Sequence, residues 1–120
     1  MTDDVSLMDD ILEEARYDWI DMGHAMGLVH IAEGGEDQLA LLRRAGALVV
    51  SLVRAGRLSP GEIGKAPGEF VPWPLAPAAA AQVLEEYLDE VFSGAKPVEP
   101  WQPCLFAVTG YNDGLPAGRR

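Results

Sequence analysis

Residues 39–75 read LALLRRAGALVVSLVRAGRLSPGEIGKAPGEFVPWPL, and this stretch decides the expected fold. Its first half is apolar on nearly every helical turn, which predicts a largely buried helix over about 37–55. Gly56 provides a natural stop for that helix. The second half contains two β-prone runs on either side of a GKAPG turn, which predicts a short hairpin at about 57–73.

Two prolines fall within the predicted hairpin strands, at Pro60 and Pro72. Proline donates no hydrogen bond to a neighbouring strand, so each is expected at a sheet edge, at a bulge or at a strand end. A small edge hairpin tolerates two such residues, whereas the interior of a large sheet does not. The sheet is therefore expected to be small.

Three further helices are predicted around this stretch, at about 6–16, 22–32 and 77–92, the last beginning at Pro77. Ser6 is expected to cap the first helix. In the second helix, Gly23 and Gly27 each cost about 1 kcal/mol relative to alanine, but their spacing permits close helix packing. Two short runs rich in aromatic and β-branched residues predict strands at 17–21 and 105–108.

The order of these elements is that of a winged helix-turn-helix, in which short turns join helices and a hairpin follows the third helix. We therefore expect an α+β fold over residues 1–110, a single winged-helix-like domain of about four helices. The hairpin at about 57–73 and a C-terminal strand would form its small antiparallel sheet. Residues 111–120 are expected to be a loose tail.

The composition indicates where in the cell the protein is expected and which kinds of partner it can attract. The formal net charge of −10 disfavours nucleic acid and anionic membranes in general and attracts basic partners. No uninterrupted apolar stretch is long enough for a membrane span, and the N-terminus is acidic where a signal peptide is basic. A cytoplasmic protein without membrane association is expected. The excess of arginine over lysine and the abundant alanine are typical of G+C-rich bacterial genomes.

Acidic residues gather on the outer faces of two predicted helices. These predicted partner-binding residues are Asp9, Asp10, Glu13 and Glu14 on the first helix and Glu85, Glu86, Asp89 and Glu90 on the fourth. Acidic helix faces are most often simply solvated. The functional interpretation is a docking surface for a cationic protein, whose approach the charge would accelerate.

Basic residues offer an alternative, a nucleic-acid-binding regulator. Its phosphate contacts would be Arg43, Arg44 and Arg54 on the third helix, Arg57 at the base of the wing and Lys65 at its tip. The net charge and the scarcity of Asn, Gln and Lys for base contacts make nucleic acid the weaker expectation. The arginines could instead lie over the core and pair with the acidic helices.

Catalytic and metal-binding motifs are weak throughout. His24 and His30 are six residues apart, about 240° around a helix, so they cannot chelate one metal together. Cys104 has no neighbouring base, and the segment GEIGKAPG lacks the Gly-Lys-Ser/Thr ending of a phosphate-binding loop. We therefore expect no enzymatic activity, no cofactor and no metal.

One segment resembles a known group of proteins. FVPWPLAPAAA, between the hairpin and an acidic helix, resembles small acidic winged-helix-like proteins of high-G+C bacteria, a likeness covering about 17–108. It is carried by Phe70, Pro72, Trp73, Leu75 and Pro77. The resemblance implies the fold but no established activity. From its own place on the hairpin, flanked by prolines, Trp73 is expected to pack against the core. Proteins of this size and charge in such bacteria are often immunity partners of polymorphic toxins. A toxin-neutralising, protein-binding module is therefore the expected function, with the nucleic-acid regulator as the alternative.

Overall fold

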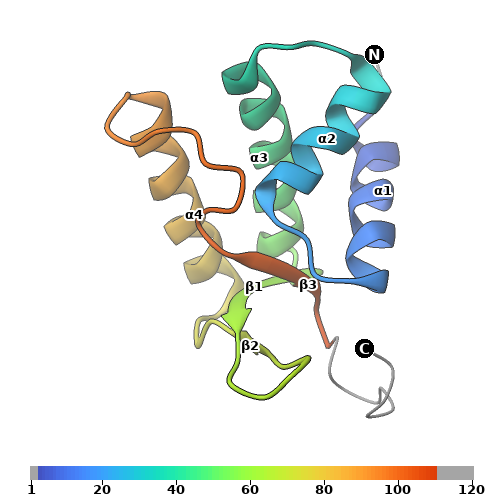
Figure 1. Ribbon diagram of the computed structural model, residues 1–120, viewed down its shortest axis with the longest axis vertical. Helices are drawn as coiled ribbons and strands as arrows, with labels where there is room; N and C mark the ends of the chain where they lie inside the picture. Colours follow the sequence, from blue (N-terminus) through green and yellow to red (C-terminus); the bar gives the residue numbers. More distant parts are fainter. Residues whose placement is uncertain (1–2, 111–120) are drawn as a thin grey trace.

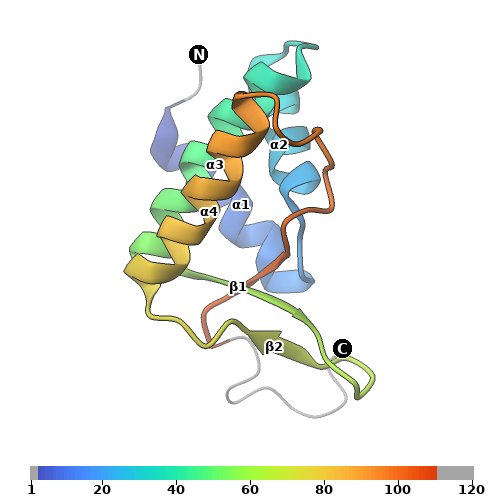
Figure 2. The ribbon, with the colours of Figure 1, turned by 90° about the vertical axis from the view of Figure 1, so that its left-hand side faces the viewer.

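The computed structural model describes residues 3–110, in which four helices stand on a small sheet (Figures 1 and 2). The helices are α1 (Asp4–Tyr17), α2 (Met22–Glu33), α3 (Gln38–Arg54) and α4 (Pro77–Phe92), and the strands are β1 (Leu58–Ile63), β2 (Phe70–Pro72) and β3 (Leu105–Val108). The predicted α+β class, four helices, hairpin and last strand are confirmed, in a layout consistent with a winged-helix-like domain. The predicted tail at 111–120 lies outside the described residues.

Side-chain caps fix where three of the helices begin. Asp3 caps α1 by accepting a hydrogen bond from the Ser6 N–H at 2.8 Å. The prediction that Ser6 is the cap is therefore wrong, because the helix starts two residues earlier. Asp21 caps α2 and Asp37 caps α3 in the same way, each through its side-chain carboxylate.

The sheet has the strand order β2-β1-β3 and is antiparallel throughout. Pro72 ends the edge strand β2, as expected. Pro60 lies inside the central strand β1 and not in an edge strand or at a strand end, but it pairs only with β3, one residue before the ladder with β2 begins at Gly61. The Pro60 carbonyl still accepts from the Trp73 N–H at 2.9 Å. The Trp73 carbonyl, which a Pro60 N–H would otherwise serve, accepts instead from the Leu75 N–H at 2.8 Å. The turn after β2 thus replaces the donor that proline lacks.

The predicted strand at 17–21 is reduced to one residue. Helix α1 continues to Tyr17 and Asp21 already caps α2, so little extended chain remains between them. Ile20 alone pairs with Phe106 of β3, through hydrogen bonds of 3.0 and 2.7 Å. This bridge joins the α1–α2 connection to the open edge of the sheet.

Helix α3 lies at the centre of the helical layer, between α2 and α4 (Figure 1). Its buried residues are Leu42, Ala45, Gly46, Leu48, Val49, Val50, Leu52 and Val53. Gly46 brings α4 close, since a Cβ atom there would lie 2.9 Å from a methyl carbon of Leu88. Trp73 packs against this core while staying half-buried, and its Nε1 donates to Glu62 at 3.0 Å.

Glycines in α2 behave differently from the prediction. A Cβ at Gly23 would meet Pro100, which belongs to a loop and not to a helix, and a Cβ at Gly27 would meet nothing within 4 Å. The predicted close helix packing at these two residues therefore does not occur within the described chain. No helix in residues 3–110 combines the length and apolar character needed to cross a bilayer.

Candidate protein-docking surface

The acidic face of α1 follows directly from the helical period. Leu7, Ile11 and Ala15 are buried against the core, so the predicted site residues Asp9, Asp10, Glu13 and Glu14 project into solvent. Glu13 pairs with Arg16 at 3.5 Å. Asp9, Asp10 and Glu14 form no ion pair with any residue of the described range 3–110. This helix therefore presents carboxylates whose charge is not offset by close contact with a cation.

The acidic residues of α4 have more partners. Glu85 accepts from Arg54 at 2.8 Å, and Glu90 pairs with Lys96 at 3.2 Å. Glu86 accepts a longer hydrogen bond from Gln82, at 3.4 Å, and Asp89 is exposed. The structure thus does not bring the two predicted acidic sets together. They lie on opposite sides of α3, and the α4 set is partly neutralised (Figure 1).

Three of the five basic residues of the nucleic-acid alternative contact other side chains of the protein. Arg44 donates to Glu33 of α2 and to Asp4 of α1, and these carboxylates raise the pKa of its guanidinium further. Arg54 pairs with Glu85 of α4. The guanidinium of Arg43 lies 4.0 Å from the centre of the Phe92 ring, a cation–π contact.

The remaining two cations belong to the hairpin. Arg57 precedes β1, and Lys65 lies in the turn between β1 and β2. Both are exposed, and neither forms an ion pair within the part of the chain that the structure describes. They are the only members of the proposed phosphate-binding set in residues 3–110 for which no contact with a carboxylate or an aromatic ring is found.

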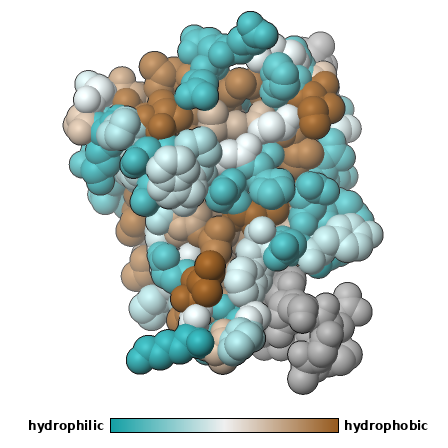
Figure 3. Space-filling view, viewed as in Figure 1, coloured by the Kyte–Doolittle hydropathy of each residue, from teal (hydrophilic) through white to brown (hydrophobic). Residues whose placement is uncertain are grey.

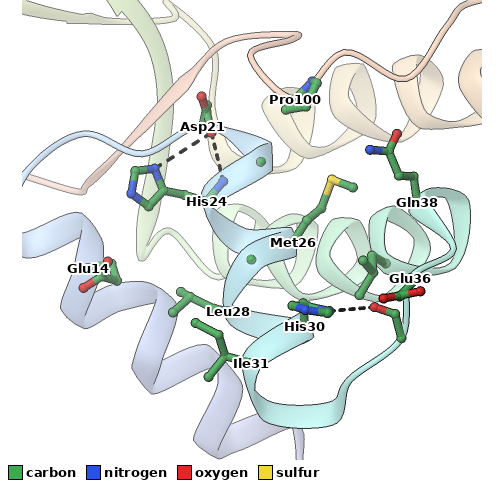
Figure 4. A pocket seen from close by; sticks show the side chains of 14 residues that line it. Glu14, Asp21, His24, Met26, Leu28, His30, Ile31, Glu36, Gln38 and Pro100 are labelled. Carbon is green, nitrogen blue, oxygen red and sulfur yellow. Dashed lines mark hydrogen bonds and ion pairs between the residues drawn. The ribbon is translucent and has the colours of Figure 1, made fainter.

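A shallow groove of about 770 Å³ along α2 was not predicted (Figure 4). Its apolar lining is Met26, Gly27, Leu28, Ile31 and Leu41, with Pro100 at one end. Acidic residues stand at its margins: Glu14 of α1 on one side, Glu36 before α3 on the other, and Asp21 at the N-terminal end of α2 (Figure 4). Figure 3 shows the apolar and pale surface over α2, bordered by hydrophilic side chains.

The outward side of α2, which lines the groove, is short of charged residues. Met22, Ala25, Met26 and Val29 are buried against the core. The opposite side carries Gly27 and Ile31, together with His24 and His30, but no Asp, Glu, Lys or Arg. Ile31 is 81% exposed. The signal was present in the sequence as MGHAMGLVHIAE, since a surface helix normally carries Asp, Glu, Lys or Arg on its outward side and this one has none between Gly23 and Ala32.

The histidines and the cysteine were the other candidates for chemistry. His24 lies near Asp21, with 3.9 Å between Nδ1 and the carboxylate, while Nδ1 of His30 lies 2.6 Å from the Gly35 carbonyl oxygen. The two rings therefore have separate local partners (Figure 4). Burial raises the pKa of the Cys104 thiol to about 12, so this group is protonated near neutral pH. Within residues 3–110, no group of three or more His, Cys, Asp or Glu residues could hold a metal ion.

Comparisons with known proteins add no relative. The chain matches no protein-family model, no curated protein and no solved structure. The resemblance drawn from Phe70, Pro72, Trp73, Leu75 and Pro77 therefore stays a prediction. The surfaces of α1 and α2 are the features of the molecule that bear on its function.

Proposed function

We propose that the protein is a small cytoplasmic binding module that neutralises a toxic protein by occupying a cationic surface, without catalysing a reaction. The observation that carries the proposal is the exposed carboxylate face of α1, beside the open apolar groove of α2. Asp9, Asp10 and Glu14 form no ion pair in the described residues, and Glu14 lines the same groove as Ile31, which is 81% exposed. Carboxylates that can attract a cationic partner therefore lie beside apolar surface that can bind it.

The physical role of the acidic face is to accelerate association. Carboxylates on one surface attract a basic partner over a distance of about one Debye length, roughly 10 Å at 0.1 M salt. Such steering raises association rates well above those of neutral surfaces. A nuclease-type toxin fits this requirement, because a site that holds nucleic acid must itself be cationic.

The α1 face supports the proposal better than the α4 face. Glu85 and Glu90 of α4 already have cationic partners in Arg54 and Lys96, so a toxin would have to compete with them. The charges of Asp9, Asp10 and Glu14 are available without such competition. We therefore assign the principal docking role to α1 and a minor role to Glu85, Glu86, Asp89 and Glu90.

The nucleic-acid regulator is the less supported function. Arg44 and Arg54 already contact carboxylates and Arg43 contacts Phe92, so phosphate binding would require these contacts to be exchanged. Arg57 and Lys65 could meet phosphates directly, but two cations give only weak, salt-sensitive binding.

The test is neutralisation in cells. A toxin domain encoded by the adjacent open reading frame should arrest growth when expressed alone, and co-expression with this protein should restore growth. Reversal of Asp9, Asp10, Glu13 and Glu14 to lysine should abolish the rescue while the fold persists, because these side chains face solvent. Failure of the wild-type protein to restore growth would contradict the proposal. A gene standing alone beside an operator-like palindrome that the protein binds would favour the regulator.

A further inference from the structure

We infer that the α2 groove receives a cationic amphipathic helix of the partner, an inference that rests on the proposed protein-binding function. The outward side of α2 offers apolar area that the described chain leaves uncovered: Leu28 is half-buried and Ile31 is 81% exposed. Surface helices normally carry charged residues on this side. Between Gly23 and Ala32, α2 carries no Asp, Glu, Lys or Arg. Its two polar side chains there, His24 and His30, line the groove but lie near Asp21 and the Gly35 carbonyl, so a second covered face is compatible with this composition.

The geometry of the groove fits a helix. Residues of α2 from Gly23 to Ile31 line it, and Gly27 among them has no atom within 4 Å of a Cβ built there. Packed helices normally lie 8–10 Å apart, depending on the side chains at the contact, and a glycine permits the closest approach. The close packing that the Gly23–Gly27 spacing suggests would then occur at Gly27, between α2 and a helix of the partner. An incoming helix would place apolar side chains at i, i+3, i+4 and i+7 over Leu28 and Ile31.

The carboxylates at the margins of the groove favour a bound helix that carries positive charge. Glu14 and Glu36 stand on opposite sides of the groove, and Asp21 stands at its end (Figure 4). Lysine or arginine residues flanking the apolar stripe of a bound helix would face these carboxylates. Uncharged or acidic helices would leave the carboxylates near apolar or like-charged groups, which lowers affinity.

A second copy of this chain is a poor candidate for the cationic helix that the groove requires. Its own α2, MGHAMGLVHIAE, contains no lysine or arginine to meet the carboxylates. Pairing two α2 faces would bring the acidic margins of both copies together, in a chain whose formal net charge is already −10. The charge balance therefore favours a basic partner over self-association.

The experiment blocks the groove without disturbing the fold. Gly27→Leu adds a side chain where the described structure has open space, and leucine favours a helix more than glycine does. Ala79→Leu is the matched control, at an exposed helical position of α4 outside the groove. The probe is a labelled 18-residue Leu/Lys peptide with one apolar helical face, and a peptide of the same composition in scrambled order serves as its control. Binding is followed by fluorescence anisotropy, and helix formation by circular dichroism.

Wild type and Ala79→Leu should bind the amphipathic peptide and induce helix in it, and Gly27→Leu should bind it about tenfold more weakly or worse. Equal binding by Gly27→Leu, or equal binding of the scrambled peptide, would overturn the inference. A concentration-dependent dimer in sedimentation, lost in Gly27→Leu, would overturn it in favour of a second copy.

The same variants separate this inference from the proposed function. If Gly27→Leu still restores growth against the toxin while the α1 charge reversal does not, the groove inference fails and the neutralising function stands. If wild type gives no rescue, the proposed function fails. Peptide binding that Gly27→Leu weakens would then identify the groove as a helix-binding site without a toxin partner.

Discussion

Arg44 and Glu33 form a two-point ion pair that joins the middle of α3 to the end of α2. Arg44 Nε donates to Glu33 Oε1 at 3.2 Å, and Nη2 donates to Oε2 at 3.1 Å. Nη1 of the same guanidinium reaches Asp4 of α1. The side chains of Arg44 and Glu33 are only 26% and 14% exposed. One arginine thus links three helices on the side of the molecule remote from the hairpin.

Arg44→Met should therefore destabilise the protein. Replacing the guanidinium leaves the half-buried Glu33 without these contacts, and we expect a loss of about 1 to 2 kcal/mol in the free energy of unfolding. Urea unfolding followed by circular dichroism measures the change. Arg16→Met, which removes only an exposed pair with Glu13, is the control and should change stability by less than about 0.5 kcal/mol. Equal effects of the two substitutions would show that the three-helix contact contributes little.

Two glycine-to-alanine substitutions should have opposite signs. Gly27→Ala adds a methyl group in open space on an exposed helix face, and we expect it to stabilise the protein by about 1 kcal/mol. Gly61→Ala places a methyl group against the Val71 carbonyl oxygen and 2.7 Å from the Phe70 ring, and we expect a loss of about 2 to 3 kcal/mol. Thermal unfolding of both variants beside wild type provides the comparison. A destabilised Gly27→Ala would mean that other atoms cover this face of α2.

Duplex DNA should not bind specifically at physiological salt. A labelled duplex titrated at low and moderate salt should show only weak, salt-sensitive association, because Arg44 and Arg54 contact carboxylates and the chain is acidic. Arg43→Ala and Arg54→Ala should leave that weak association unchanged. Tight binding with a steep salt slope, lost in these two variants, would instead establish the regulator.

The central helix and the hairpin could be predicted from the sequence because their signals are local. Asp37 caps α3, the apolar period runs along its length, and Pro77 occupies the first turn of α4. The place of Pro60 could not be predicted in this way. Beside Pro60 the ladder with β2 has ended, and the Trp73 carbonyl accepts from the Leu75 N–H of the following turn; both features arise only in the folded chain.

The candidate site likewise has features that local sequence predicts and features that depend on how the helices pack. The acidic faces of α1 and α4 follow from helical periodicity, and their exposure was predictable. The sequence could not predict which of these carboxylates are neutralised, since Arg54 meets Glu85 only after α3 and α4 have packed. The groove depends likewise on three separate segments that bring Glu14, Glu36 and Pro100 around α2. Only the lack of Asp, Glu, Lys and Arg on the outward side of α2 pointed to the groove beforehand.

The most direct test of docking at α1 is the association rate constant with the toxin domain that we propose the protein neutralises. Stopped-flow mixing at 0.1 M and 1 M salt compares three proteins: wild type, the Asp9/Asp10/Glu13/Glu14 reversal to lysine, and the Glu85/Glu86/Asp89/Glu90 reversal. Between these salt concentrations the Debye length falls from about 10 Å to about 3 Å. We predict that the wild-type rate falls as salt rises, that the α1 reversal slows association about tenfold or more at 0.1 M, and that the α4 reversal stays within about twofold. A rate that the α1 reversal leaves unchanged, or that the α4 reversal lowers as much, would contradict docking at α1.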